Sequence, residues 1–226
     1  MSGTTYYLRA YAINNEGIGY GDELTFTTLM PVTDIDGNNN TGVTIGSQVW
    51  MVGNLKTTRH QNGDLIGTTI PATLNIGTEN APKYQWAYGG NEDNVAAYGR
   101  LYTWYSVTDN RNVCPTGWHL PFDSEWSTLT TYLGGEDYIG EILKEIGITH
   151  WPSPNFAATN KSGFTALPGG YREKSGNFDM IGNGGYWWSA TEENATFAWY
   201  RSLIYNNMSI VFGNKDYGFS VRCIKD

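Results

Sequence analysis

The sequence has little positive charge and no long apolar run, and each shortage excludes a class of partner. It carries 14 Lys+Arg against 22 Asp+Glu, a net charge of −8. That balance argues against binding to a nucleic-acid backbone, which requires clustered cations. No apolar stretch approaches the roughly 18–20 residues of a membrane-spanning helix. We therefore expect no nucleic-acid partner and no membrane span.

Cysteine is also scarce, since Cys114 and Cys223 are the only two in the chain. They lie far apart in the sequence, so they cannot form a local CxxC metal or redox motif. The two residues are compatible either with two buried thiols or with one long-range disulfide, and we favour the disulfide. Closing so long a loop would stabilise the fold by roughly 4–5 kcal/mol.

Glycine and aromatic residues are abundant instead. The chain has 28 Gly, 9 Trp and 16 Tyr. Frequent turns and large flat side chains favour short strands joined by irregular loops. Apolar alternation around Gly46 and Ser47 predicts one hairpin, and short apolar runs after residue 162 predict further strands, whereas residues 60–97 resemble a loop.

Two segments carry helical periodicity. Asp123 can cap the run SEWSTLTTYL, in which Trp126, Leu129 and Leu133 form one apolar stripe before a Gly-Gly stop. The second helix is expected from Asp137 to Ile146. Two helices and many short strands predict an α+β fold.

Residues 4–28 alternate in period two on both sides of the turn sequence NNEGIGYG, which predicts a β-hairpin. The stretch resembles the last two strands of a fibronectin type III repeat, so residues 1–30 are assigned as a partial repeat. An isolated hairpin is marginally stable. We therefore expect it to dock on its own large domain or to complete a sheet in another chain. Its candidate assembly residues are Tyr7, Tyr11, Leu24 and Phe26.

The remaining chain, residues 31–226, is assigned as one domain with a family resemblance. DIDGNNNTGVTIGSQVWMVGNLKTT, YGRLYTWYSV, CPTGWHLPFDSEWSTLTTYLGG, SGFTALPGGYR, GYWWSATE and GFSVRCIKD occur in this order. They closely resemble the bacterial Fibrobacter succinogenes major paralogous domain. The resemblance implies a C-type-lectin-like fold, related to that of formylglycine-generating enzymes, with two helices, twisted antiparallel strands and long loops. It also implies that Cys223 meets Cys114.

Catalytic signatures are missing from the sequence. The enzyme branch of the resembled superfamily uses a pair of active-site cysteines in its C-terminal part, where this chain has only Cys223. His60, His119 and His150 lack the HExxH or HxH spacing of a zinc site. We therefore expect a non-catalytic protein without a cofactor.

One segment could hold a hard cation, because it places oxygen-bearing side chains at every second position. These weak metal candidates are Asp34, Asp36, Asn38 and Asn40. The segment lacks the closing Glu of an EF-hand loop, and Asp-Gly is a common hairpin turn, so we favour a turn. The calcium-binding tripeptides of sugar-binding C-type lectins are also missing.

Recognition remains as the expected role, because Tyr and Trp offer large contact area at low entropic cost. The candidate ligand-binding residues are Trp187, Trp188, Glu192, Trp199, Tyr200, Asn206 and Asn207. In a strand, neighbouring side chains point to opposite faces, so one of Trp187 and Trp188 should be buried. The alternative reading is that most of these tryptophans form core.

These observations predict an extracellular recognition or adhesion module of a bacterial surface protein that binds a glycan or a protein. A structural subunit of an extracellular filament or stalk, assembled by strand addition through the hairpin, is the alternative. The first residues, MSGTTYYLRAY, show no signal peptide. A chain that begins within a fold lacks its upstream part, so this absence is weak evidence of a cytosolic location.

Overall fold

Strands dominate the structure, a computed structural model that describes residues 4–137, 139–204 and 207–226. Strands account for 38 % and helices for 13 % of it, with four short α-helices in the part described. The predicted α+β fold of the C-type-lectin-like kind, with its twisted antiparallel strands, two helices and long loops, is therefore wrong. The chain folds mostly as β-structure divided among several sheets, because few of its segments repeat a helical pattern for more than two turns.

The largest sheet has five strands, in the order β3-β4-β5-β14-β8, and its paired neighbours are antiparallel. The strands are β3 (Met30–Thr33), β4 (Asn39–Ile45), β5 (Gln48–Met51), β8 (Trp118–His119) and β14 (Ile224–Lys225). The hairpin predicted around Gly46 is confirmed, because Ile45 pairs with Gln48 across a two-residue turn in which Gly46 takes a φ of 62°.

The last strand brings the two cysteines together. β14 lies between β5 and β8, and Cys223 just before it bonds to Cys114 just before β8. Both residues are fully buried in the core. The disulfide favoured from the sequence is thus present.

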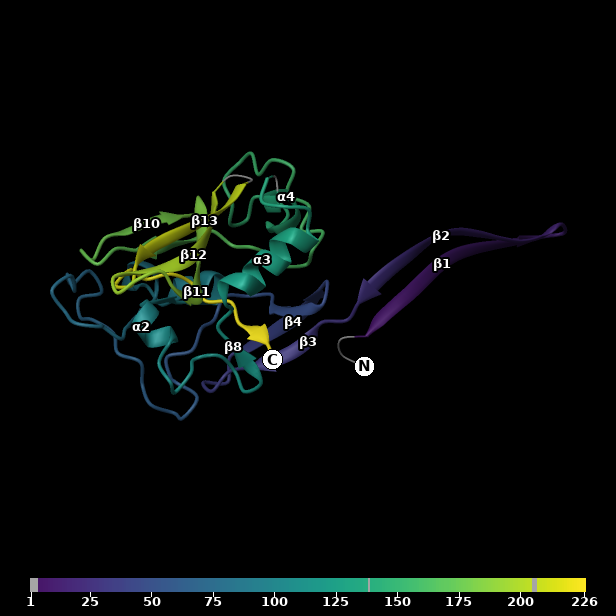
Figure 1. Ribbon diagram of the computed structural model, residues 1–226. Coiled ribbons are helices and arrows are strands. Elements are labelled where there is room, and N and C mark those ends of the chain that lie inside the picture. Colours follow the sequence, from purple (N-terminus) through teal and green to yellow (C-terminus); the bar gives the residue numbers. More distant parts are fainter. Residues whose placement is uncertain (1–3, 138, 205–206) are drawn as a thin grey trace.

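A second sheet joins three long strands, which are β11 (Gly184–Glu192), β12 (Phe197–Ile204) and β13 (Asn207–Asn214). Two short ribbons complete the β-structure, β6 (Gln85–Trp86) with β7 (Leu101–Tyr102) and β9 (Gly169–Arg172) with β10 (Phe178–Ile181). Strand β11 separates two apolar clusters, since Trp188 packs in one and Trp187 in the other. Figure 1 shows this sheet beside helix α3.

The helices are short and lie around the sheets (Figure 1). They are α1 (Asp93–Tyr98), α2 (Trp104–Val107), α3 (Asp123–Tyr132), α4 (Ile139–Leu143) and the 3₁₀ turn η1 (Tyr88–Gly90). The first predicted helix is confirmed as α3, whose Trp126 and Leu129 are fully buried. The second was predicted too long at its C-terminal end, because the chain after Leu143 turns to pair with Ala166.

The first two strands, β1 (Thr5–Asn14) and β2 (Gly17–Thr27), form the predicted hairpin. It reaches away from the rest of the molecule in Figure 1 and does not dock on the large domain. Tyr7, Tyr11 and Leu24 are each about two-thirds exposed. The side chain of Phe26, the fourth predicted assembly residue, lies outside the described residues.

No helix in the described part of the chain is long and apolar enough to cross a membrane.

Candidate functional site

The two adjacent tryptophans that were candidate ligand residues are core residues. Trp187 and Trp188 are both fully buried, whereas alternation predicted burial for one of them. The alternation rule places their rings on opposite faces of β11, and apolar clusters cover both faces. Trp187 Nε1 donates to Asn54 Oδ1, and Trp188 Nε1 donates to the Tyr102 carbonyl. Neither ring can contact a ligand in this fold.

The other candidates on this sheet are split between surface and core. Glu192 is exposed and pairs with the buried ammonium of Lys215. Trp199 is half-buried against Phe212 on the outer side of the sheet. Tyr200 points to the opposite side and packs on the buried Phe219 ring, 4.5 Å between centroids. Asn206 and the side chain of Asn207 lie outside the described residues. The predicted set therefore does not form one surface.

The segment with four oxygen-bearing side chains, the weak metal candidates, is a turn in which these side chains make hydrogen bonds to protein groups. Asp34 accepts hydrogen bonds from the backbone and amide of Asn38. Asp36 accepts from Thr58, and Asn40 binds the backbone of the segment after β5. Burial opposes ionisation of Asp36, but the hydrogen bonds from Thr58 outweigh it and lower the pKa of this carboxyl. The four side chains thus bind three different parts of the chain, which are the turn itself, Thr58 and Gly53.

The three histidines also lie in separate surroundings. His119 binds the carboxylates of Asp226 and Glu125, and His150 binds Glu145. His60 is buried in a loop, and its Nδ1 has no hydrogen-bond partner among the described residues.

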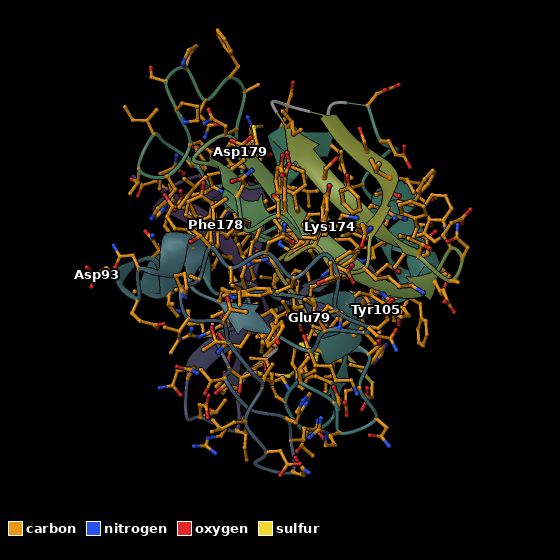
Figure 2. All side chains as sticks on the ribbon, turned by 90° about the vertical axis from the view of Figure 1, so that its left-hand side faces the viewer. Glu79, Asp93, Tyr105, Lys174, Phe178 and Asp179 are labelled. Atoms are coloured by element: carbon orange, nitrogen blue, oxygen red, sulfur yellow. A yellow bond between two sulfur atoms is a disulfide. The ribbon has the colours of Figure 1, made fainter. Side chains whose placement is uncertain are left out.

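A cluster of aromatic side chains that the sequence analysis did not select gathers on the face turned away from the hairpin. We call it the tyrosine face, and it consists of Tyr84, Tyr88, Tyr105, Tyr171, Phe178 and Tyr217, all half-buried. The rings of Tyr171 and Tyr217 are stacked, with 6.4 Å between centroids, and those of Tyr88 and Phe178 meet edge to face. Figure 2 views this face directly, with Tyr105 and Phe178 labelled. Its rings come from five separated segments of the chain.

A buried arginine holds the tyrosine face together. The guanidinium of Arg172 lies 4.0 Å above the Trp86 ring and 5.7 Å from the Phe178 ring. It donates to the carbonyls of Ala72 and Glu173, so it fastens the loop before β6 to strand β9. Burial lowers the pKa of Arg172 to about 10, which leaves the side chain charged at neutral pH. The aromatic rings are therefore fixed by packing and hydrogen bonds before any ligand arrives.

Carboxylates surround the aromatic rings. Figure 2 shows Glu79, Asp179 and Lys174 on the same face. The Tyr84 hydroxyl donates to Glu79 at 2.8 Å, which raises the pKa of that phenol. Burial raises the pKa of Asp216, with Lys174 acting against the shift and Glu79 reinforcing it. The tyrosine face thus offers neutral phenol groups and mostly acidic acceptors.

An open groove of about 440 Å³ adjoins these rings. Its lining residues are Thr68, Thr69, Ile70, Pro71, Ala72, Thr73, Trp86, Ala87, Gly89, Gly90 and Glu92. Trp86 connects the groove to the tyrosine face, because it also lies against Tyr84 and Arg172. Its Nε1 donates to Thr69 Oγ1 at 2.9 Å, and Glu92 at the rim pairs with Arg100. Trp86 is itself only 1 % exposed, so the groove offers the exposed Ile70 side chain together with hydroxyl and carboxylate groups.

The chain belongs to the Fibrobacter succinogenes major domain family, whose model matches residues 43–225. The match confirms the family resemblance over most of the chain. The matched residues do not include the hairpin, whose resemblance to a fibronectin type III repeat stays a prediction. No curated protein and no solved structure matches the chain.

Proposed function

We propose that this protein is a non-catalytic, extracellular recognition module of a bacterial surface protein that binds a glycan. The observation that supports it best is the tyrosine face, a group of fixed, half-buried rings beside an open groove. Aromatic rings pack against the apolar faces of sugars, and carboxylates and phenols bind their hydroxyl groups.

The charge of this face narrows the class of glycan. Glu79, Glu173, Asp179 and Asp216 stand near Lys174, and the whole chain is acidic. Like charges across an interface are unfavourable, so a polyanionic glycan would be repelled. We expect a neutral sugar or an amino sugar.

An extracellular location agrees with the buried disulfide. Structural disulfides form and persist in oxidising compartments and are rare in reducing ones. Cys114 and Cys223 are fully buried, so their bond is part of the packed core. Intact-mass measurement with and without reductant should differ by the mass of two hydrogens.

Glycan-array screening followed by calorimetry tests the proposal. Phe178→Ala and Tyr105→Ala each remove one ring of the tyrosine face and are expected to weaken binding by about tenfold, which corresponds to 1.4 kcal/mol. Tyr132→Ala is the matched control, because Tyr132 is 64 % exposed on α3 and is not part of the tyrosine face. Equal binding by all variants, or no bound glycan, would contradict the proposal.

The non-catalytic part of the proposal has its own test. Hydrolase, transferase and redox screens should give no turnover above background. A turnover that is abolished by changing Glu192 or His119 would overturn it.

A second candidate function, assembly by strand addition, is supported by the hairpin. Tyr7 and Leu8 are adjacent, and therefore on opposite faces of β1, yet both are more than half exposed. The outer edges of β1 and β2 also carry no further strand in the described sheet. Such a ribbon can add to a sheet of another chain.

Deleting residues 1–30 tests this second function. The full chain should associate in sedimentation experiments, and the truncated chain should be folded but strictly monomeric. A full chain that stays monomeric at high concentration would exclude assembly through the hairpin.

A further inference from the structure

A buried lysine near β10 has no counterion among the described residues. Lys144 follows helix α4 and is only 2 % exposed. Backbone hydrogen bonds from Ala166 to Leu143 and from Glu145 to Ala166 fix the main chain around Lys144. Its Nζ makes one long hydrogen bond, 3.4 Å to the Phe156 carbonyl, and lies 5.4 Å from the centre of the Trp151 ring. Among the described residues, no carboxylate lies within ion-pair distance of this ammonium.

The environment of this ammonium favours an anion. A buried charge is costly unless it is paired, and an ammonium can donate three hydrogen bonds, of which the described residues accept one. Burial lowers the pKa of Lys144, while the more distant carboxylate of Glu141 acts in the opposite direction. Arg172 and Arg222, two other buried cations, are better satisfied, since each donates to several carbonyl groups.

Lys144 lines a small cavity that opens to the surface. The cavity has a volume of about 70 Å³ and is lined by Lys144, Trp151, Pro152, Pro154, Asn155, Met180, Asn183 and Ile204. Pro152, Pro154 and Asn183 are exposed, so its mouth reaches solvent. A single water needs roughly 10–15 Å³ of such space. The cavity can thus enclose a group of a few heavy atoms, and it is far smaller than the groove beside the tyrosine face.

Asn155, which also lines this cavity, has a side-chain oxygen that accepts no hydrogen bond from the described residues. Asn155 Nδ2 donates to the carbonyls of Glu145 and Gly147, and these two bonds fix the orientation of the amide. Its Oδ1 is buried without a hydrogen-bond partner among the described residues. A ligand that fills the cavity would therefore meet an ammonium, a carbonyl-type acceptor and apolar walls.

We propose that this cavity binds a small hydroxycarboxylate of about the size of glycolate or lactate. Its carboxylate neutralises the Lys144 ammonium, and its hydroxyl donates to Asn155 Oδ1. Its carbon atoms pack against Trp151, Met180 and Ile204. These apolar walls suit carbon better than the strongly hydrated oxygens of phosphate or sulfate.

Titration of ¹⁵N-labelled full-length protein with glycolate, at constant ionic strength set with sodium chloride, tests the proposal. Saturable shifts are expected in the amides of residues 143–156 and 180–183. Acetate, which lacks the hydroxyl, should bind roughly three- to tenfold more weakly, the ratio expected for one hydrogen bond. Shifts that do not saturate, or that lie elsewhere in the chain, would overturn the proposal even if no variant folds.

Two variants complete the experiment. Lys144→Met keeps an unbranched side chain that is one heavy atom shorter and removes the charge, so the glycolate-dependent shifts should disappear. Lys161→Met removes an exposed lysine outside the cavity and should leave them unchanged. Tyr105→Ala should also leave them unchanged, which separates this site from the proposed glycan site. Retained binding by Lys144→Met would refute the assignment.

Discussion

Removing the disulfide should cost this protein a large part of its stability. The cross-link joins residues with a sequence separation of 109. In the chain-entropy treatment, opening a loop of that length costs about 4–5 kcal/mol at 25 °C. Typical domains are stable by only about 5–15 kcal/mol, so the Cys114→Ala/Cys223→Ala double variant should be marginal.

Equilibrium unfolding in urea measures this effect. The wild type, the double variant and the reduced wild type are compared by tryptophan fluorescence, since Trp118 and Trp188 share the core cluster that contains the bond. The denaturant dependence should also be steeper without the bond, because the unfolded chain is then less compact and exposes more surface. A loss below about 1 kcal/mol with an unchanged slope would refute the reasoning.

Two further predictions concern packing and pH. Gly185→Ala should destabilise the fold by about 1–3 kcal/mol in the same assay, because a Cβ there would lie 2.1 Å from the Trp187 ring. Burial lowers the pKa of His119, but hydrogen bonds to Asp226 and Glu125 outweigh this effect and raise the pKa above its ordinary 6.5. The resulting stabilisation should be fully present below pH 6.5 and be lost as pH rises through the folded-state pKa, and His119→Asn should abolish this dependence.

Local features of the fold were predictable from the sequence, whereas its assembly into sheets was not. The apolar stripe after Asp123 located helix α3, although Asp123 is its first residue and Phe122 its N-cap, and alternation located the hairpins. The end of α4 was missed because a bridge to Ala166, distant in sequence, stops the helix. The insertion of β14 between β5 and β8 leaves no periodic signal, and the fold class was wrong for the same reason.

The candidate site was also only partly predictable from the sequence. Alternation correctly placed Trp187 and Trp188 on opposite faces, but it could not show that both faces of β11 are covered. The tyrosine face combines rings from distant segments, which no spacing rule connects. One signal was present: Tyr84, Trp86 and Tyr88 alternate within a stretch that otherwise resembles a loop.

The position of the cross-link has a mechanical consequence. Because Cys223 is bonded to Cys114, a force that pulls the chain at Cys223 passes through this bond to the segment that precedes Cys114. The segment between the cysteines would stay unextended when the rest unravels. At 3.3–3.6 Å per residue, this segment would otherwise add roughly 360–390 Å to the length of the extended chain. Optical-tweezers traces of the oxidised protein should be shorter by this length than traces recorded with reductant, and equal lengths would show that the tie bears no force.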